Sequence, residues 1–330
     1  MTTLLTGATG FLGSAILRQL VDDGQNVRVL ARPNGDRRNI EKVACEITVG
    51  DLNDTASLQT AVAGCNALYH VAADYRIWTP NPSELYRTND LGTVELFRAA
   101  AAAGIERMVY TSSVATLGIR SDGKPSNEAT PVSRSDMVGH YKRSKFDAET
   151  SVMSLISNED LPIVIVNPST PIGPRDVKPT PTGRIIVEAA AGRMPAFVDT
   201  GLNVVHVDDV AFGHLQAFKN GVIGERYILG GEDLSLRQIL AEVAEIVGRK
   251  PPVISLPRTP LFPFAYLSEF IARLRGGSEP MLSVDGLRMS KKRMYFSSAK
   301  AREMLGYVTR PASEALRDAV DWFTTNGYVK

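Results

Sequence analysis

The stretch Thr6-Gly7-Ala8-Thr9-Gly10-Phe11-Leu12-Gly13 decides the fold of this chain. Two leucines at positions 4 and 5 belong to an apolar strand ahead of it, and residues 14–21 have the pattern of an amphipathic helix. A glycine-rich turn between a strand and a helix is typical of a loop that binds a dinucleotide, because free N–H groups at the helix N-terminus face the phosphates. We therefore predict such a site near the start of the chain.

The glycines of this turn have different expected roles. Gly7 permits a tight turn, Gly10 lets the backbone approach the pyrophosphate, and Gly13 lets the helix pack closely on the sheet. Other residues of the turn that we expect to line the cofactor are Thr9, Phe11 and Leu12.

Short apolar runs alternate with helical patterns through the first half of the chain. These runs predict strands near residues 4–5, 27–30, 46–49, 67–71, 108–110 and 163–166. Repeated strand–helix units indicate an α/β protein with a doubly wound parallel sheet, the Rossmann fold, whose two faces are covered by helices. Ligands of such sheets bind beyond the C-terminal ends of the strands, where the strand order reverses.

The second half of the chain differs in composition and predicts a smaller lobe. Several prolines follow the sixth strand, and separated helical segments come after them. We expect residues 1–170 to form mainly the dinucleotide-binding domain and residues 171–330 mainly a C-terminal substrate-binding lobe. Segments near 203–220 are expected to return to the first domain.

Three helical segments are predicted within this lobe. One runs from Leu234 to Val247, with Ser235 or Asp233 as its N-cap, and another covers residues 312–324. The segment 260–274 is rich in Leu, Phe and Tyr. Two interpretations of it are open: a buried helix or lid, or an apolar substrate mouth that also contacts a membrane surface.

Tyr141 and Lys145 stand four residues apart, well downstream of the glycine-rich turn. On a helix, this spacing places both on one face, so the Lys145 ammonium can lie near the Tyr141 phenol. A nearby cation favours phenolate, and we expect it to lower the tyrosine pKa from its usual value near 10. Together with the turn, the pair indicates nicotinamide redox chemistry with Tyr141 as acid or base. Alone, the spacing also fits a tyrosine packed on a surface lysine.

The residues after the second strand bear on which nicotinamide cofactor is bound. An NAD enzyme typically offers Asp or Glu to the ribose hydroxyls there, whereas this chain has Arg32 and Arg37. Arginine suits a 2′-phosphate, so NADP is the expected cofactor. Asp36 keeps NAD as the minority alternative, and a solvated loop with ordinary arginines is the structural alternative.

Composition narrows the classes of partner. The 330 residues are 44% hydrophobic and 22% charged, enough for a main domain with a smaller lobe. The net charge of +1 argues against nucleic acid bound through a broad basic face. Cys45 and Cys65 lack a metal-ligand spacing and are too few for a disulfide framework, so we expect no metal and a reducing, cytoplasmic location. Because the first strand begins within a few residues of Met1, we expect no signal peptide ahead of it, and no apolar run approaches the length needed to span a bilayer.

With these motifs in place, the chain resembles an extended short-chain dehydrogenase/reductase of the NAD-dependent epimerase/dehydratase family over nearly its full length. The family's catalytic Ser or Thr lies five residues before a glycine, which Ser113 matches, with Ser112 as the fallback. The resemblance implies that Ser113 orients the substrate oxygen, that Tyr141 exchanges a proton with it and that Lys145 binds the ribose. The cofactor-lining residues that it implies are Asp51, Leu52, Val71, Ala72, Ala73, Asn89, Ser112, Pro168 and Ser169.

The resemblance also separates reaction types. Dehydratases of the family carry Asp-Glu after the catalytic Thr, where this chain has Val114 and Ala115, and epimerases carry a diphosphate-binding arginine where it has Leu202. Residues 291–307 resemble dihydroflavonol reductases and steroid dehydrogenases, and residues 167–174 are similar to hopanoid-associated sugar epimerases. We therefore favour hydride transfer to or from a hydroxyl or ketone of an apolar or lipid-linked small molecule.

Seven residues are candidates for substrate contact: Tyr75, Arg76, Trp78, Thr170, Arg175, Arg184 and His206. Trp78 is alternatively a core residue, Arg175 a partner of Asp176, and His206 a packing histidine. Two rival functions stay open: an epimerase that keeps its NAD(P) tightly bound, and a non-enzymatic cofactor-sensing regulator. Homodimers formed through helices that flank the sheet are usual in the family, so a homodimer is the expected assembly.

Overall fold

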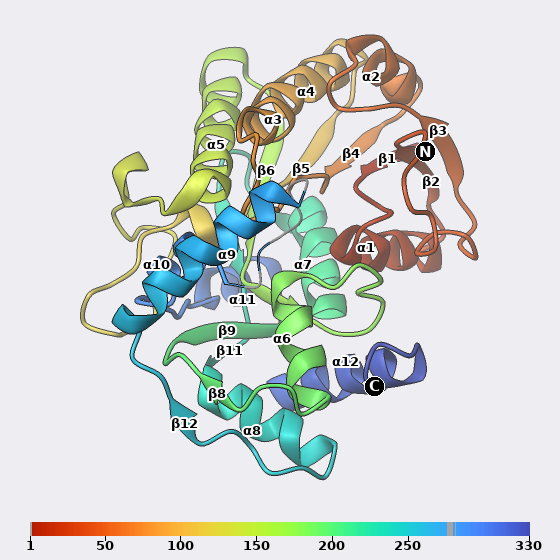
Figure 1. Cartoon of the computed structure of the whole chain (residues 1–330). Helices are drawn as coiled ribbons and strands as arrows, with labels where there is room; N and C mark the ends of the chain where they lie inside the picture. The colour runs from red at the N-terminus through yellow and green to blue at the C-terminus, as the bar shows by residue number, and fades with distance from the viewer. Residues whose placement is uncertain (1, 276–279, 281) are drawn as a thin grey trace.

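A seven-stranded parallel sheet lies at the centre of the computed structural model, which describes residues 2–275, 280 and 282–330 (Figure 1). The strand order is β3-β2-β1-β4-β5-β6-β10 and reverses between β1 and β4. This is the doubly wound order of the Rossmann fold, so the predicted fold class is confirmed. The strands are β1 Thr2–Thr6, β2 Asn26–Ala31, β3 Glu46–Val49, β4 Ala67–His70, β5 Arg107–Thr111, β6 Ile163–Pro168 and β10 Arg226–Leu229.

Helices cover both faces of this sheet, which explains why its strands read as continuous apolar runs. Successive strand residues point to opposite faces, and accordingly Leu5 packs with the core under one set of helices and Leu4 with the core under the other. The first set is α1 (Phe11–Asp22), α7 (Val207–Asn220) and α11 (Ala299–Leu305), and the second is α2 (Thr55–Val62), α4 (Gly92–Ala102) and α5 (Gly139–Glu159).

A smaller sheet forms the centre of the second lobe. Its middle strand β9 (Gly201–His206) pairs antiparallel with β11 (Glu232–Ser235) and parallel with β7 (Thr170–Ile172) and β13 (Arg293–Met294). Helices α6 (Pro181–Ala190), α8 (Leu236–Ile246) and α12 (Ala312–Thr325) share a core with it. Further short elements are β8 Ala196–Phe197, β12 Ile254–Ser255, α3 Ser83–Tyr86 and α10 Val284–Met289.

The chain passes from the small lobe back to the main sheet. Helix α7 packs against the first core, together with α1, while β9 just before it stays in the small sheet. Strand β10 then pairs with β6 and becomes the seventh strand. Nothing in its four residues separates them from other short apolar runs, so the sequence did not predict this strand, and only its pairing with β6 identifies it.

Two helix predictions for this lobe can be compared directly with the structure. The helix expected over 312–324 is α12. The helix expected from Leu234 begins later, because Leu234 belongs to β11. Ser235 is the N-cap of α8 and forms a capping box with Gln238, which fixes where the strand ends and the helix begins.

Helix α9 (Phe262–Leu274) contradicts one interpretation of its sequence. That interpretation was a buried helix or lid, and its burial is wrong, because only Ala265 and Ala272 of the helix are buried. Most of its large apolar side chains are exposed, at 64% for Phe264, 56% for Tyr266, 55% for Leu267, 58% for Phe270 and 72% for Leu274. None of the helices in the described ranges has the length and hydropathy needed to cross a membrane.

Candidate active site

The glycine-rich turn joins β1 to α1 and is formed by close backbone contacts. Gly7 has a φ of +76°, a left-handed conformation that favours glycine. A Cβ at Gly7 would lie 2.6 Å from the Ala72 nitrogen, and one at Gly13 would lie 2.1 Å from the Gly7 oxygen. Gly10 is the N-cap of α1. Side chains at these positions would fill the space beside the helix N-terminus, so the turn fits a pyrophosphate held by backbone N–H groups.

The end of β4 is held against β1 beside this turn. The Thr6 hydroxyl accepts hydrogen bonds from the Val71 and Ala72 N–H groups, both at 3.2 Å, and lies 2.7 Å from His70 Nδ1. Burial lowers the pKa of His70 to about 3, so this histidine stays neutral and structural. The segment after β4 therefore lies at the point where the strand order reverses, between β1 and β4. It contains Val71, Ala72 and Ala73.

Asn89 ties that segment to the helix of the catalytic pair. Its Nδ2 donates to the Asp74 carbonyl at 2.9 Å and to Ser144 Oγ at 3.0 Å, and its Oδ1 accepts from the Asp74 N–H at 2.7 Å. Ser144 precedes Lys145 on α5. Asn89 thus holds the segment after β4 against helix α5, next to the expected cofactor site.

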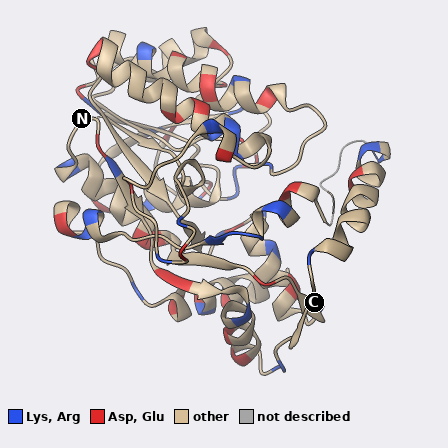
Figure 2. Cartoon of the chain, turned by 90° about the vertical axis from the view of Figure 1, so that its left-hand side faces the viewer, with Lys and Arg blue, Asp and Glu red and all other residues tan. Residues whose placement is uncertain are grey.

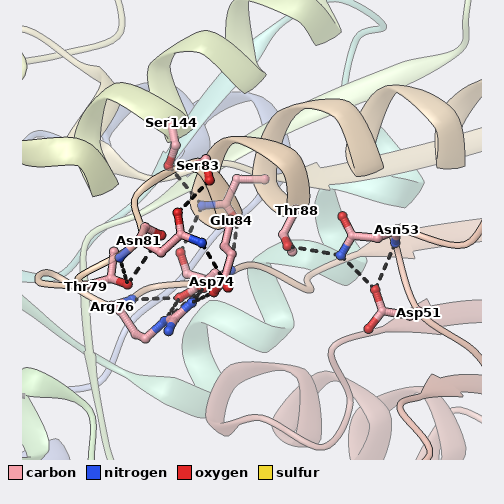
Figure 3. A network of polar contacts seen from close by, with 11 residues as sticks. Asp51, Asn53, Asp74, Arg76, Thr79, Asn81, Ser83, Glu84, Thr88 and Ser144 are labelled. Atoms are coloured by element: carbon pink, nitrogen blue, oxygen red, sulfur yellow. Dashed lines mark hydrogen bonds and ion pairs between the residues drawn. The ribbon is translucent and has the colours of Figure 1, made fainter. Parts of the chain in front are cut away.

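A second polar group follows β3, where the adenine is expected. Asp51 Oδ1 accepts two hydrogen bonds from Asn53, from its N–H and its Nδ2, both at 2.9 Å. Asn53 Nδ2 also donates to Thr88 Oγ1 at 3.3 Å, as Figure 3 shows. Leu52 is buried beside them. The carboxylate after β3 is therefore oriented by its neighbours.

Ser113 and Tyr141 are brought together from two elements. Ser113 follows β5 and caps a short 3-10 turn, and Tyr141 lies in the first turn of α5. The Ser113 side chain lies close enough to the Tyr141 phenol to influence its pKa. Burial raises the Tyr141 pKa, and Ser113 acts in the opposite direction. Ser112 is not part of this pair, since its buried Oγ has no partner among the described residues.

Lys145 lies one turn after Tyr141 and points into the protein. Its Nζ donates to the Thr111 carbonyl at 2.9 Å and to the Tyr110 hydroxyl at 3.3 Å. Burial lowers the Lys145 pKa to about 8. The expectation that Lys145 lowers the Tyr141 pKa is not met in this structure, because burial raises that pKa and the group that opposes burial is Ser113 rather than Lys145.

A buried polar network holds Ser113 in place. Asn167 Nδ2 donates to the Ser113 carbonyl at 3.1 Å, and the Thr116 hydroxyl donates to the same carbonyl at 2.8 Å. Asn167 Nδ2 also donates to Glu149 Oε2 at 2.8 Å, the Thr116 hydroxyl lies 2.9 Å from the same oxygen, and Glu149 pairs with Arg226 at 3.1 Å. Sequence reasoning missed this network. One signal was present, since Glu149 follows Lys145 by four residues and so shares its helix face.

Pro168 and Ser169 lie where β6 ends. Pro168 is the last residue of β6, and the Ser169 N–H donates to the Leu229 carbonyl of β10 at 3.1 Å. The Ser169 Oγ is buried and has no hydrogen-bond partner among the described residues. Its position beyond the carboxyl end of a central strand fits the predicted place on the nicotinamide side.

The loop after β2 carries the residues expected to choose between NAD and NADP. Arg38 holds both oxygens of Asp36, with Nε 3.0 Å from each. Arg32 is exposed and Arg37 is half-buried. Within the described part of the chain, neither guanidinium has a hydrogen-bond or ion-pair partner. Asp36, the candidate for binding a ribose diol, is thus paired with Arg38. The guanidinium groups of Arg32 and Arg37 are available to bind a phosphate.

Three substrate candidates follow β4. Arg76 pairs with Asp74 and lies 3.1 Å from Glu84 (Figure 3). Tyr75 is exposed, whereas Trp78 is half-buried and so is not a full core residue. The charge of the Arg76 guanidinium is thus balanced by Asp74 and Glu84.

The other substrate candidates lie in the small lobe. Arg175 pairs with Asp208 rather than with Asp176, so the expected alternative partner was wrong. His206 is buried, accepts from the Asp208 N–H at 3.0 Å and lies 3.1 Å from an Asp318 oxygen, which makes it a structural residue. Thr170 lies in β7, and Arg184 lies on α6.

Comparison with known proteins identifies the family. Residues 3–230 match the NAD dependent epimerase/dehydratase family, a span that contains the glycine-rich turn, Ser113, Tyr141 and Lys145. The chain belongs to this family. It is thus an NAD(P)-dependent enzyme of the extended short-chain dehydrogenase/reductase type, and the resemblance noted from its motifs is confirmed.

Relatives of this family member cover its full length. A Synechocystis protein with the provisional name dihydroflavonol 4-reductase is 43% identical over 330 residues, or 99% of this chain and 95% of that protein. Sterol demethylase protein B of Methylococcus capsulatus is 35% identical over 100% of both chains. The crystal structure of gox2253 has a TM-score of 0.90 at 52% identity and covers 100% of this chain and 99% of that one.

Proposed function

We propose that this protein is an NADP(H)-dependent oxidoreductase that transfers hydride to or from a hydroxyl or ketone of an apolar or lipid-linked substrate. The observation that carries the proposal is the meeting of Ser113, which follows β5, with Tyr141 on α5, where Lys145 follows one turn later. Bound cofactor would supply or accept the hydride. The backbone turn at Gly7 and Gly13 fits its pyrophosphate.

The protein's own residues account for the proton chemistry. Ser113 orients the substrate oxygen, and Tyr141 gives the proton to that oxygen during reduction or takes it during oxidation. The raised Tyr141 pKa keeps the phenol protonated, which suits donation to a ketone. Lys145 is held by the Thr111 carbonyl and is proposed to bind the ribose.

Substitution of Tyr141 tests this assignment. Tyr141→Phe should lower kcat by at least about a hundredfold, because it removes the general acid, and should leave NADPH affinity within about twofold. Lys145→Met should lower both kcat and the affinity for NADPH. Isothermal calorimetry measures binding and NADPH absorbance measures turnover. A Tyr141→Phe variant that kept most of its activity would show that another group is the acid.

Support for NADP comes from the loop after β2. Asp36, the acid available for a ribose diol, is held by Arg38, while Arg32 and Arg37 have no partner in the described chain. Two available guanidinium groups suit a 2′-phosphate. NAD would need Asp36 to leave Arg38.

Support for an apolar substrate comes from α9 and from one relative. Helix α9 exposes large apolar side chains beside the exposed basic residues Arg273 and Arg275. This combination suits peripheral contact with an anionic lipid surface, from which a lipid-linked substrate would come. The full-length relative named as a sterol demethylase protein, and the similarity to hopanoid-associated proteins, favour a polycyclic lipid substrate.

One alternative is an epimerase, as the family name includes that reaction. It would use the same three residues and keep its nucleotide through the cycle. The leucine at position 202, where sugar-nucleotide epimerases are expected to carry arginine, favours the reductase. Free cysteines at 45 and 65 support the proposed cytoplasmic location, and a homodimer stays a prediction.

A further inference from the structure

A cavity of about 100 Å³ lies beside the segments that carry the catalytic hydroxyls. Ala115, two residues after Ser113, lines it, and so does Lys142, which follows Tyr141. Leu117, Ile119 and Met137 give it apolar walls, and Met289 and Lys292 of the α10 region complete it. The Ala115 N–H also donates to Ser113 Oγ at 3.1 Å, so the cavity lies next to the segment that carries Ser113.

Lys142 is an unusual wall residue for such a cavity. Its side chain is buried, with 8% exposure, and among the residues that the structure describes its Nζ has only the Met294 sulfur, at 3.6 Å, as a hydrogen-bond partner. Sulfur is a weak acceptor. No carboxylate in the described chain forms an ion pair with Lys142. Burying an ammonium without a partner costs several kcal/mol, so a methionine or leucine would serve packing better here.

The charges around the cavity are suited to one negative charge. Lys142 and Lys292 both line it, and burial together with Lys292 lowers the Lys142 pKa to about 8. Asp136 also lines the cavity, and its Oδ2 accepts hydrogen bonds from the Ser133 N–H and hydroxyl. Two cations and one anion leave a net single positive charge, and the lining contains no arginine fork for a phosphate.

We propose that this cavity binds a carboxylate of the substrate, with Lys142 as its buried ligand and Lys292 as a second cation. The cavity volume of about 100 Å³ admits a carboxylate and a few waters. The inference rests on the proposed function and deepens it. The substrate is then an apolar hydroxy or keto acid, whose carboxylate fixes the reacting carbon against Ser113 and Tyr141.

Matched ligands test the site without requiring turnover. Calorimetry would compare dodecanoate with methyl dodecanoate, which lacks the charge, on the protein loaded with NADP. We expect the acid to bind about 10- to 100-fold more tightly than the ester, the value of one charge-assisted hydrogen bond. Lys142→Met should remove this preference. Lys250→Met, at an exposed lysine outside the cavity, should keep it.

Several results would overturn the proposal: no binding of the acid, equal binding of acid and ester, or a preference that survives Lys142→Met. Thermal unfolding gives a second measurement. The Tm of Lys142→Met should equal or exceed that of the wild type, because a buried ammonium is removed. A marked fall in Tm would assign Lys142 a structural role instead. Hydride transfer plays no part in these measurements, so they are separate from the Tyr141→Phe test of the proposed function.

Discussion

At the scale of single residues, the polar side chains of the site act mainly by fixing backbone. Asn89 bonds both the N–H and the carbonyl of Asp74, and Asn167 and Thr116 bond the Ser113 carbonyl. These bonds fix the backbone that carries Ser113 and the segment after β4, and a fixed backbone keeps the side chains of a site in a set geometry.

The residue-scale prediction concerns the cofactor. Arg32→Ala should weaken NADPH binding by about tenfold or more and change NADH binding by less than about twofold, because only NADPH carries the 2′-phosphate. The matched control is Arg237→Ala, because Arg237 is also exposed but lies on α8, away from the loop after β2. Calorimetric titration of both nucleotides measures the difference. Equal losses for NADPH and NADH would contradict the phosphate assignment.

At the scale of elements, the start of α6 carries a buried carboxyl. Asp176 Oδ2 accepts from the N–H and hydroxyl of Thr180, the α6 N-cap, both at 2.8 Å, and its Oδ1 has no partner among the described residues. Burial raises the Asp176 pKa from 3.8 to about 6. The folded value exceeds the unfolded one, so this group's contribution to stability is complete below pH 3.8 and is lost as pH rises through about 6.

Asp176→Asn should therefore flatten the pH dependence of unfolding between 3.8 and about 6. The amide oxygen can still accept from Thr180, and no charge is buried at neutral pH. We expect the variant at pH 7 to be as stable as the wild type or more stable by up to about 2 kcal/mol. Urea unfolding across this range provides the test, with Asp321→Asn at an exposed site as control. An unchanged slope would show that Asp176 is not the titrating group.

Helix α9 supplies a second prediction at this scale. Replacing both Phe264 and Phe270 with serine should reduce binding to vesicles that contain phosphatidylglycerol, because the exposed apolar area falls. Stability should change by less than about 0.5 kcal/mol per site, since both rings are exposed. Val308→Ser, at a 66% exposed residue outside α9, is the control. Co-sedimentation measures binding, and equal binding by the double variant would remove α9 from the membrane contact.

At the scale of the whole molecule, cofactor exchange separates reductase from epimerase. A reductase releases its nucleotide each cycle, so purified protein should carry little nucleotide and should gain about 2.7 kcal/mol of stability at NADPH a hundredfold above Kd. The first measurement is the amount of nucleotide released when the protein is denatured. The second is thermal unfolding with and without added NADPH. NAD that co-purifies and resists removal would instead indicate the epimerase.

Charge on the whole molecule is also informative. Figure 2 shows acidic and basic residues interspersed over the helices of both lobes, in keeping with the net charge of +1. Local features such as the two lysines of the cavity and the arginines at the C-terminal end of α9 differ from this even distribution. These places, rather than an overall field, are where anionic groups are expected to bind.

The sequence by itself determined the fold class, the glycine-rich turn and the spacing of Tyr141 and Lys145, because these depend on local patterns: strand and helix periodicity, left-handed glycine and one helix face. Tertiary structure decided the rest. It paired β10 with β6, exposed α9, held Asp36 on Arg38, raised the Tyr141 pKa by burial and left Lys142 buried without an acid. Each of these depends on which distant residues meet and how much water they exclude, and local patterns carry no such information.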